Sequence, residues 1–202
     1  MKVSEAIESR RSVKNYDPDH VMPEEDLAEL IRLTKLAPSS FNMQNYRLLV
    51  VRDPELRQQI RAEAWDQAHV TDASVLFILC ADLNAHLEDS KKYWGHAPQE
   101  VQDMLGPMIH TFYEGNDRLI RDEAIRSSAL AGMTLMLAAK GMGYASCPMI
   151  GFDGEKVAEL INLPDGYALS FMIPVGKETQ PGWERGDRLP DKEVVSYDRF
   201  KG

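Results

Sequence analysis

Basic and hydroxyl side chains lie close together near the start of the chain. They are Arg10, Arg11, Ser12 and Lys14. An arginine offers a planar set of N–H donors to phosphate oxygens, and a lysine offers a compact positive charge. The group therefore has the chemistry of a phosphate-binding site, although a solvated basic turn accounts for the same charges. Because the formal net charge of the chain is -9, any anion must be held by such a local cluster.

A second group of polar side chains follows a proline that is expected to end a helix. Pro38 is followed by Ser39, Ser40, Asn42 and Gln44, just before an apolar segment. Hydroxyl and amide groups supply both donors and acceptors, which suits the recognition of a heterocycle. Serine and asparagine are also common where helices end, so an ordinary helix terminus accounts for the same residues.

Two further segments could contact a ligand. In the segment 147–153, Pro148 fixes the backbone, Gly151 permits a close approach, and Asp153 suits the start of a helix. An ordinary connection between a strand and a helix has the same features. Arg185 and Arg188 form a second basic pair in the polar C-terminal segment. The glycine and proline residues of this segment suggest that it is held in place.

Composition limits the classes of function. The 202 residues fit one domain with a sizeable core, which we expect to span residues 1–202. The acidic net charge argues against nucleic acid or an anionic membrane as a partner. The chain has only two cysteines, Cys80 and Cys147, and no visible secretory signal, which favours a reducing cytoplasm. Its apolar stretches are too short to span a membrane, which favours a soluble protein.

Some common chemistries lack their sequence signs. The spacing of the polar residues in the segment 86–110, His86, Glu88, His96 and His110, matches no compact ligand set, so we expect no metal site. Phosphate-binding loops of the GxGxxG or GKS type do not occur, which argues against Rossmann dehydrogenases and P-loop enzymes. Cys147 has no evident neighbouring base and is expected in the core.

The elements that must position these residues follow from hydrophobic periodicity. Helices are predicted over residues 2–10, 54–66, 124–142 and 153–161, and from Pro23, at the first helical position, until Pro38. Strands are predicted over residues 47–52, 75–81, 144–147 and 168–175, the second of them buried on both faces. Small residues in the helix 124–142 permit close packing with another helix.

The remaining segments are less regular. Residues 84–116 are predicted to form a helical excursion with a break near Gly106 and Pro107, and a polar tail is expected from about residue 176. Four aromatic residues of the excursion form either a lid or internal packing: Tyr93, Trp94, Phe112 and Tyr113. The absence of βαβ repetition favours a three-layer α+β sandwich.

Taken in order, the motifs are similar to those of a known family. The chain contains, in this order, the segments RRSVKNY and APSSFNMQNY, a long glycine-bounded helix followed by CPMIGFD, and a terminal DRLP. In this order the motifs resemble those of the nitroreductase family of FMN enzymes. The resemblance spans nearly the whole chain. It implies a central, mostly antiparallel sheet flanked by helices, in a dimer.

The resemblance also assigns roles to residues. Arg10 matches a phosphate ligand, Ser12 a ribityl or phosphate contact, and Lys14 a cation near the pyrimidine edge of the flavin. Ser39, Ser40 and Asn42 match residues that reach the flavin of the other subunit, and Gln67 falls near a position where an amide contacts the flavin. The segment that passes the ring is matched by Pro148, Met149, Ile150 and Gly151. Arg188 matches a terminal phosphate ligand. Asn45-Tyr46 replaces the usual Pro-Trp, Ile150 replaces a glutamate of some relatives, and Arg185 is a candidate for a second terminal cation that is missing near Gly186.

The function that the resemblance implies is an FMN-dependent oxidoreductase. It would pass electron pairs from NADH or NADPH to a small electron-poor acceptor, such as a nitroaromatic, quinone or enone, by a ping-pong mechanism. The flavin carries the chemistry, so no catalytic side chain is expected beyond an electrostatic role for Lys14. Two alternatives remain: a flavin-binding redox sensor or carrier with little turnover, and another flavin chemistry on the same scaffold. The active unit would be a homodimer with shared flavin sites.

Overall fold

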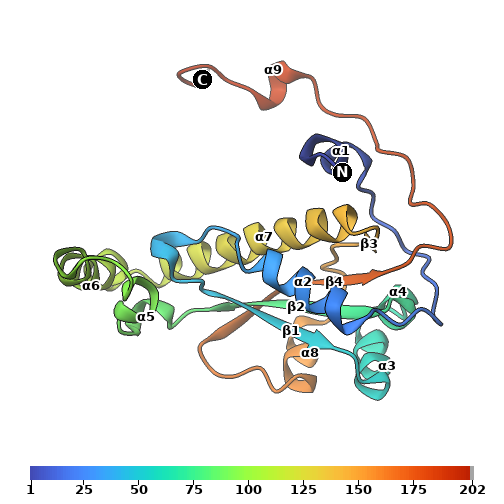
Figure 1. The fold of residues 1–202 in the computed structure, drawn as a ribbon, viewed down its shortest axis with the longest axis horizontal. Helices are drawn as coiled ribbons and strands as arrows, with labels where there is room; N and C mark the ends of the chain where they lie inside the picture. The colour runs from blue at the N-terminus through green and yellow to red at the C-terminus, as the bar shows by residue number, and fades with distance from the viewer. Residues whose placement is uncertain (201–202) are drawn as a thin grey trace.

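A four-stranded antiparallel sheet separates two layers of helices (Figure 1). The structure is a computed structural model and describes residues 1–200. The strands are β1 (Tyr46–Val51), β2 (Val75–Asp82), β3 (Ala145–Ser146) and β4 (Tyr167–Gly176), in the order β1-β2-β4-β3. The helices are α1 (Val3–Ser9), α2 (Glu24–Thr34), η1 (Ser40–Asn42), α3 (Pro54–Glu63), α4 (His69–Asp72), η2 (Ala85–Leu87), α5 (Lys91–Trp94), α6 (Gln99–Tyr113), α7 (Asp117–Gly141), α8 (Gly154–Leu160) and α9 (Asp191–Val194).

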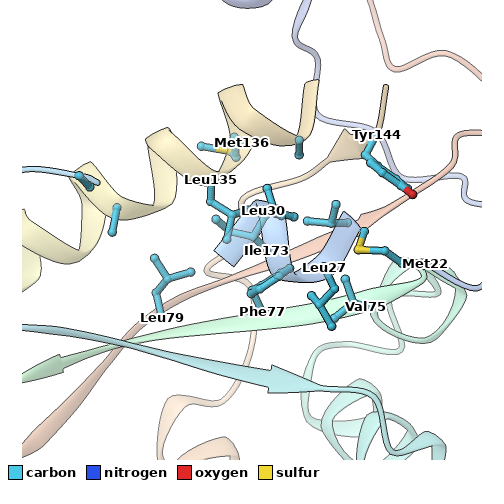
Figure 2. Packing of buried hydrophobic residues seen from close by; sticks show 14 of the residues in the cluster. Met22, Leu27, Leu30, Val75, Phe77, Leu79, Leu135, Met136, Tyr144 and Ile173 are labelled. Atoms are coloured by element: carbon cyan, nitrogen blue, oxygen red, sulfur yellow. The ribbon is translucent and has the colours of Figure 1, made fainter. Parts of the chain in front are cut away.

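Strand β2 supplies the centre of the core on both sides of the sheet. All eight of its residues are buried, as the continuous apolar run predicts. Because side chains alternate along a strand, its odd-numbered residues pack against α2 and α7, and its even-numbered residues pack towards α3 and α8. Figure 2 shows Val75, Phe77 and Leu79 on the first of these two sides, with Leu30 and Leu135 among the side chains that pack there. The predicted three-layer α+β sandwich is confirmed.

Helix α7 lies across the sheet and comes unusually close to β4. A Cβ atom added at Gly132 would fall 2.2 Å from Cζ of Phe171, so only glycine allows this approach. The small residues of the helix therefore serve packing against the sheet as well as against α2. The helix begins at Asp117 rather than at residue 124, because the side chain of Asn116 accepts a hydrogen bond from the backbone N–H of Leu119 and caps it.

The predicted break near Gly106 and Pro107 is wrong. Helix α6 continues through both residues. A proline inside a helix costs about 3 kcal/mol, but one face of α6 buries Leu105, Ile109 and Tyr113. Burying a large apolar side chain contributes roughly 1.5–3 kcal/mol, so three of them outweigh the proline.

The other predictions for local structure differ only slightly from the structure. Pro23 precedes the first residue of α2 instead of occupying the first helical position. Asp153 caps α8 by accepting hydrogen bonds from the backbone N–H groups of Glu155 and Lys156, as predicted. Every helix among residues 1–200 is too short or too polar to cross a lipid bilayer.

The C-terminal tail leaves the body of the molecule. Beyond β4 it passes α1 and ends with α9 away from the sheet (Figure 1). The side chains of residues 184–200 are all exposed, including Tyr197 and Phe200, which are 86% and 90% exposed.

Candidate functional site

Three arginines meet at the C-terminal end of α1. Arg185 donates hydrogen bonds from Nη2 to the carbonyl oxygens of Ile7 at 2.7 Å and Arg10 at 3.1 Å. Arg11 donates from Nη1 to the carbonyl oxygens of Glu8 and Arg10. The last carbonyls of a helix lack partners within the helix and carry partial negative charge, so cations are favoured there. The third arginine, Arg10, keeps Nη1 buried, with no hydrogen-bond partner among residues 1–200.

The tail brings a fourth guanidinium group into the same region. Partial desolvation lowers the pKa of Arg185, and the positive charges of Arg11, Arg188 and Arg10 lower it further. Arg188 itself is exposed and, within residues 1–200, donates only to carbonyl oxygens of its own segment, Gly186 and Asp187. Like charges held this close repel one another, so an anion that binds among them relieves the repulsion.

A pocket of about 110 Å³ opens beside the arginines. Arg10, Arg11, Lys140 and Ser146 are among the residues that line it. Ser146 Oγ is buried and, within residues 1–200, has no hydrogen-bond partner. Buried polar groups are normally satisfied, so two such atoms, Arg10 Nη1 and Ser146 Oγ, suggest that a polar ligand completes this region.

The basic segment 10–14 and the segment 147–153, both predicted to contact a ligand, lie next to each other. Ser12 pairs with Ser146 in a parallel bridge, and the backbone N–H of Val13 donates to the carbonyl oxygen of Ser146 at 3.2 Å. This pairing places the segment 10–14 next to the one that begins at Cys147. Burial raises the pKa of the Cys147 thiol, whereas the charge of Lys14 and a hydrogen bond with Ser12 oppose that rise.

Gln67 reaches the glycine of the segment 148–151. Its Nε2 donates to the carbonyl oxygen of Gly151 at 2.9 Å. A Cβ atom at Gly151 would fall 2.6 Å from the ring of Trp65, so a larger residue would have to displace this exposed side chain. Met149 pairs with Met172 of β4 and is buried, which anchors the segment to the sheet. Pro148 and Ile150 are exposed on either side of it.

His69 also belongs to this region, and the sequence analysis missed it. The side chain is 3% exposed, and its Nε2 has no hydrogen-bond partner among residues 1–200. Burial lowers the pKa of His69, the positive charge of Lys14 lowers it further, and Asp72 opposes both. A histidine two residues after Gln67 was the available signal, but only the fold shows that it lies near Lys14.

The loop that contains η1 lies apart from the arginines. Figure 1 shows η1 towards the end of the molecule where α6 lies, whereas α1 lies over the opposite end of α7. Within the chain, Ser39 Oγ accepts from the backbone N–H of Gln44, and Ser40 Oγ accepts from the hydroxyl of Tyr113. Asn42 donates from Nδ2 to the carbonyl oxygen of Tyr93. One copy of the chain therefore does not join the two predicted groups.

The structure decides between internal packing and a lid for two of the four aromatic residues of the excursion. Tyr93 and Tyr113 are buried, so their role is internal packing. Phe112 is 51% exposed and stacks edge-to-face with Phe41 at 5.5 Å between ring centroids.

Within residues 1–200, no group of three or more His, Cys, Asp or Glu side chains could hold a metal ion.

Comparison with known proteins identifies the family. Residues 7–177 match the sequence profile described as the nitroreductase family. The chain belongs to the nitroreductase family. Protein DrgA of Synechocystis sp. is 50% identical over 195 residues, which cover 94% of this chain and 93% of that protein. MhqN of Bacillus subtilis, named as an NAD(P)H nitroreductase, is 34% identical over 95% of this chain and 96% of that protein.

A solved structure has the same fold. A nitroreductase-type protein from Exiguobacterium sibiricum, crystallised in complex with FMN, has a TM-score of 0.89 and 29% identity, with 98% of both chains covered. Membership of the family makes this chain an oxidoreductase, and FMN is the cofactor of the family. The arrangement of residues suits this cofactor, since clustered guanidinium groups beside the buried Nη1 of Arg10 match a terminal phosphate.

Proposed function

We propose that this chain passes electron pairs from NADH or NADPH to a small electron-poor acceptor, such as a nitroaromatic, quinone or enone, with FMN as its bound cofactor. The observation that carries the proposal is the cluster of Arg10, Arg11, Arg185 and Arg188 near the end of α1, together with the buried Nη1 of Arg10, which has no hydrogen-bond partner within residues 1–200. In a chain with a net charge of -9, such a cluster is suited to a bound phosphate rather than to bulk solvation.

The residues next to the arginines would hold the rest of the cofactor. Ser12 would contact the ribityl chain or phosphate, and Gln67 and Gly151 would lie beside the ring. Lys14 and His69 would face its pyrimidine edge, which is supported by the effect of the Lys14 charge on His69. When bound, FMN supplies the transfer of an electron pair between donor and acceptor.

The protein's own groups would work by position and charge. The positive charge of Lys14 favours the additional negative charge that the ring carries when reduced. Ile150, which is 80% exposed, presents an apolar surface where some relatives carry a glutamate, so no carboxylate acts at this position. One open face would serve the donor and the acceptor in turn, which corresponds to ping-pong kinetics.

We further propose that the active unit is a homodimer in which the loop 38–44 of one subunit completes the site of the other. The separation of this loop from the arginines within one chain supports the proposal. The tail leaves several apolar side chains exposed, and α7 leaves Leu130 and Met133 about half exposed. A second copy would cover these surfaces.

The two free thiols, Cys80 and Cys147, fit a reducing cytoplasm.

Steady-state kinetics test the proposed activity. With oxygen excluded, because it can itself reoxidise a reduced flavin, oxidation of NADH or NADPH should require an added acceptor such as menadione or a nitroaromatic, and double-reciprocal plots at several acceptor concentrations should be parallel. A protein that binds FMN without reduction by either nicotinamide would instead be a flavin carrier or sensor. Intersecting plots would contradict the ping-pong order.

A further inference from the structure

The loop that contains η1 has an unfavourable backbone conformation. Phe41, Asn42 and Gln44 have φ values of 49°, 55° and 47°, and none of them is a glycine. Residues with a side chain avoid this left-handed region, and asparagine tolerates it best. Three such residues within four positions persist only where surrounding contacts hold them.

The contacts that hold the loop come from the helical excursion. Trp94 of α5 donates from Nε1 to the carbonyl oxygen of Phe41 at 2.8 Å. The hydroxyl of Tyr113, in the last turn of α6, donates to Ser40 Oγ at 2.7 Å. Both donors therefore act on the residues where the backbone enters the left-handed region.

Apolar packing attaches the loop to the same helices. Met43 is 1% exposed and belongs to a cluster with Leu105, Ile109 and Tyr113 of α6. This cluster is separate from the two that cover the sheet. The loop and the excursion thus share one small core of their own, so the shape of the loop depends on α5 and α6 more than on the sheet.

We propose that Trp94 and Tyr113 are positioning residues that hold the loop 38–44 in the shape that reaches the flavin of the partner subunit. The inference rests on the proposed function, since it assumes that this loop contacts FMN. Neither side chain needs to touch the cofactor. Each acts through one hydrogen bond to the loop, and loss of that bond lets the backbone relax towards negative φ values.

The test removes one donor at a time: Tyr113→Phe removes only the hydroxyl, and Trp94→Phe replaces the indole with an aromatic ring that has no N–H. Trp94→Phe and Tyr113→Phe should each weaken FMN binding to the dimer about fivefold, because a neutral hydrogen bond of ordinary strength is lost. Binding is measured from the quenching of FMN fluorescence on titration into the apoprotein. The visible circular dichroism of the bound flavin should also change, because its surroundings are altered, whereas a general loss of stability would leave it unchanged.

Tyr93→Phe is the matched control. It removes a hydroxyl from the same excursion, but the hydroxyl of Tyr93 donates to the carbonyl oxygen of Ala85 and not to the loop. FMN affinity should therefore stay at the wild-type value. Equal weakening in Tyr93→Phe and Tyr113→Phe would mean general loosening of the excursion and would overturn the inference.

Arg10→Ala separates the inference from the proposed function. If Arg10→Ala weakens FMN binding while Trp94→Phe and Tyr113→Phe bind FMN normally with an unchanged spectrum, the positioning role is wrong and the proposed function stands. If the wild-type protein does not bind FMN, both are wrong.

Discussion

Arg10 follows α1 with one guanidinium nitrogen buried and, within residues 1–200, without a hydrogen-bond partner, and its charge is one of three arginine charges that lower the pKa of Arg185. Hydrogen bonds to a charged group contribute about 1.5–3 kcal/mol, so Arg10→Ala should weaken FMN binding about tenfold or more. Titration of the apoprotein with FMN measures the effect. Arg32→Ala is the control, because it removes a guanidinium group whose partner is Glu29 on the exposed side of α2. Equal affinity in the two variants would show that the phosphate lies elsewhere.

His69 gives the apoprotein a pH-dependent stability. Its pKa in the folded chain is lowered, first by burial and then by Lys14, relative to about 6.5 in the unfolded chain. The unfolded state therefore binds more protons as the pH falls through 6.5, and the folded state loses stability. In His69→Gln this loss should be smaller.

Urea midpoints of the apoprotein at pH 7.5 and pH 5.5 measure this difference. His69→Gln should narrow the gap between the two midpoints, whereas His96→Gln, which alters an exposed histidine, should keep the wild-type gap. Part of the gap should persist in His69→Gln, because burial also lowers the pKa of His86. A full wild-type gap in His69→Gln would show that its buried imidazole does not contribute.

At the scale of elements, the contact between α7 and β4 depends on Gly132. Gly132→Ala places a Cβ atom against Phe171 and Leu79, and overpacking of this kind costs about 1–3 kcal/mol. Gly141→Ala, at the end of the same helix, places its Cβ atom more than 4 Å from the other side chains and segments of residues 1–200. Both variants gain the higher helix propensity of alanine, so Gly132→Ala should be the less stable of the two. Equal free energies of unfolding in urea would contradict the close approach.

The sequence predicted the elements whose signals are local. The run Val75–Asp82 is apolar at nearly every position, and such a run is typical of a strand buried on both faces. The helix α6 was predicted to break because proline has a strong local signal, while the burial of Ile109 and Tyr113 that compensates for it is a tertiary effect. The start of α7 was missed because its first turns are polar and only the cap at Asn116 marks them.

The candidate site was predicted in part for the same reason. Arginine and lysine at positions 10–14 are visible as a group, and their pairing with β3 brings them beside the segment 148–151. His69 was missed, because a single histidine in a helix carries no ligand pattern of its own. The two hydrogen bonds that Trp94 and Tyr113 make to the loop join residues more than 50 positions apart, which periodicity does not detect.

At the scale of the whole molecule, the exposed tail and the separated loop predict an obligate dimer. Such interfaces typically bury more than about 2,000 Å². Dilution should then release subunits and FMN together, because each site needs both chains. Sedimentation velocity at decreasing protein concentration, recorded at the flavin and protein wavelengths, measures both. A monomer that keeps its FMN and its activity would contradict the shared site, even though the flavin assignment would survive.

The central claim is that this chain holds FMN, and the visible absorption spectrum of the purified protein tests it most directly. The account predicts a yellow protein with flavin absorption bands, from which heat denaturation releases FMN rather than FAD. Apoprotein prepared without flavin should take up added FMN and recover the same spectrum. A colourless protein that does not bind added FMN would contradict the account.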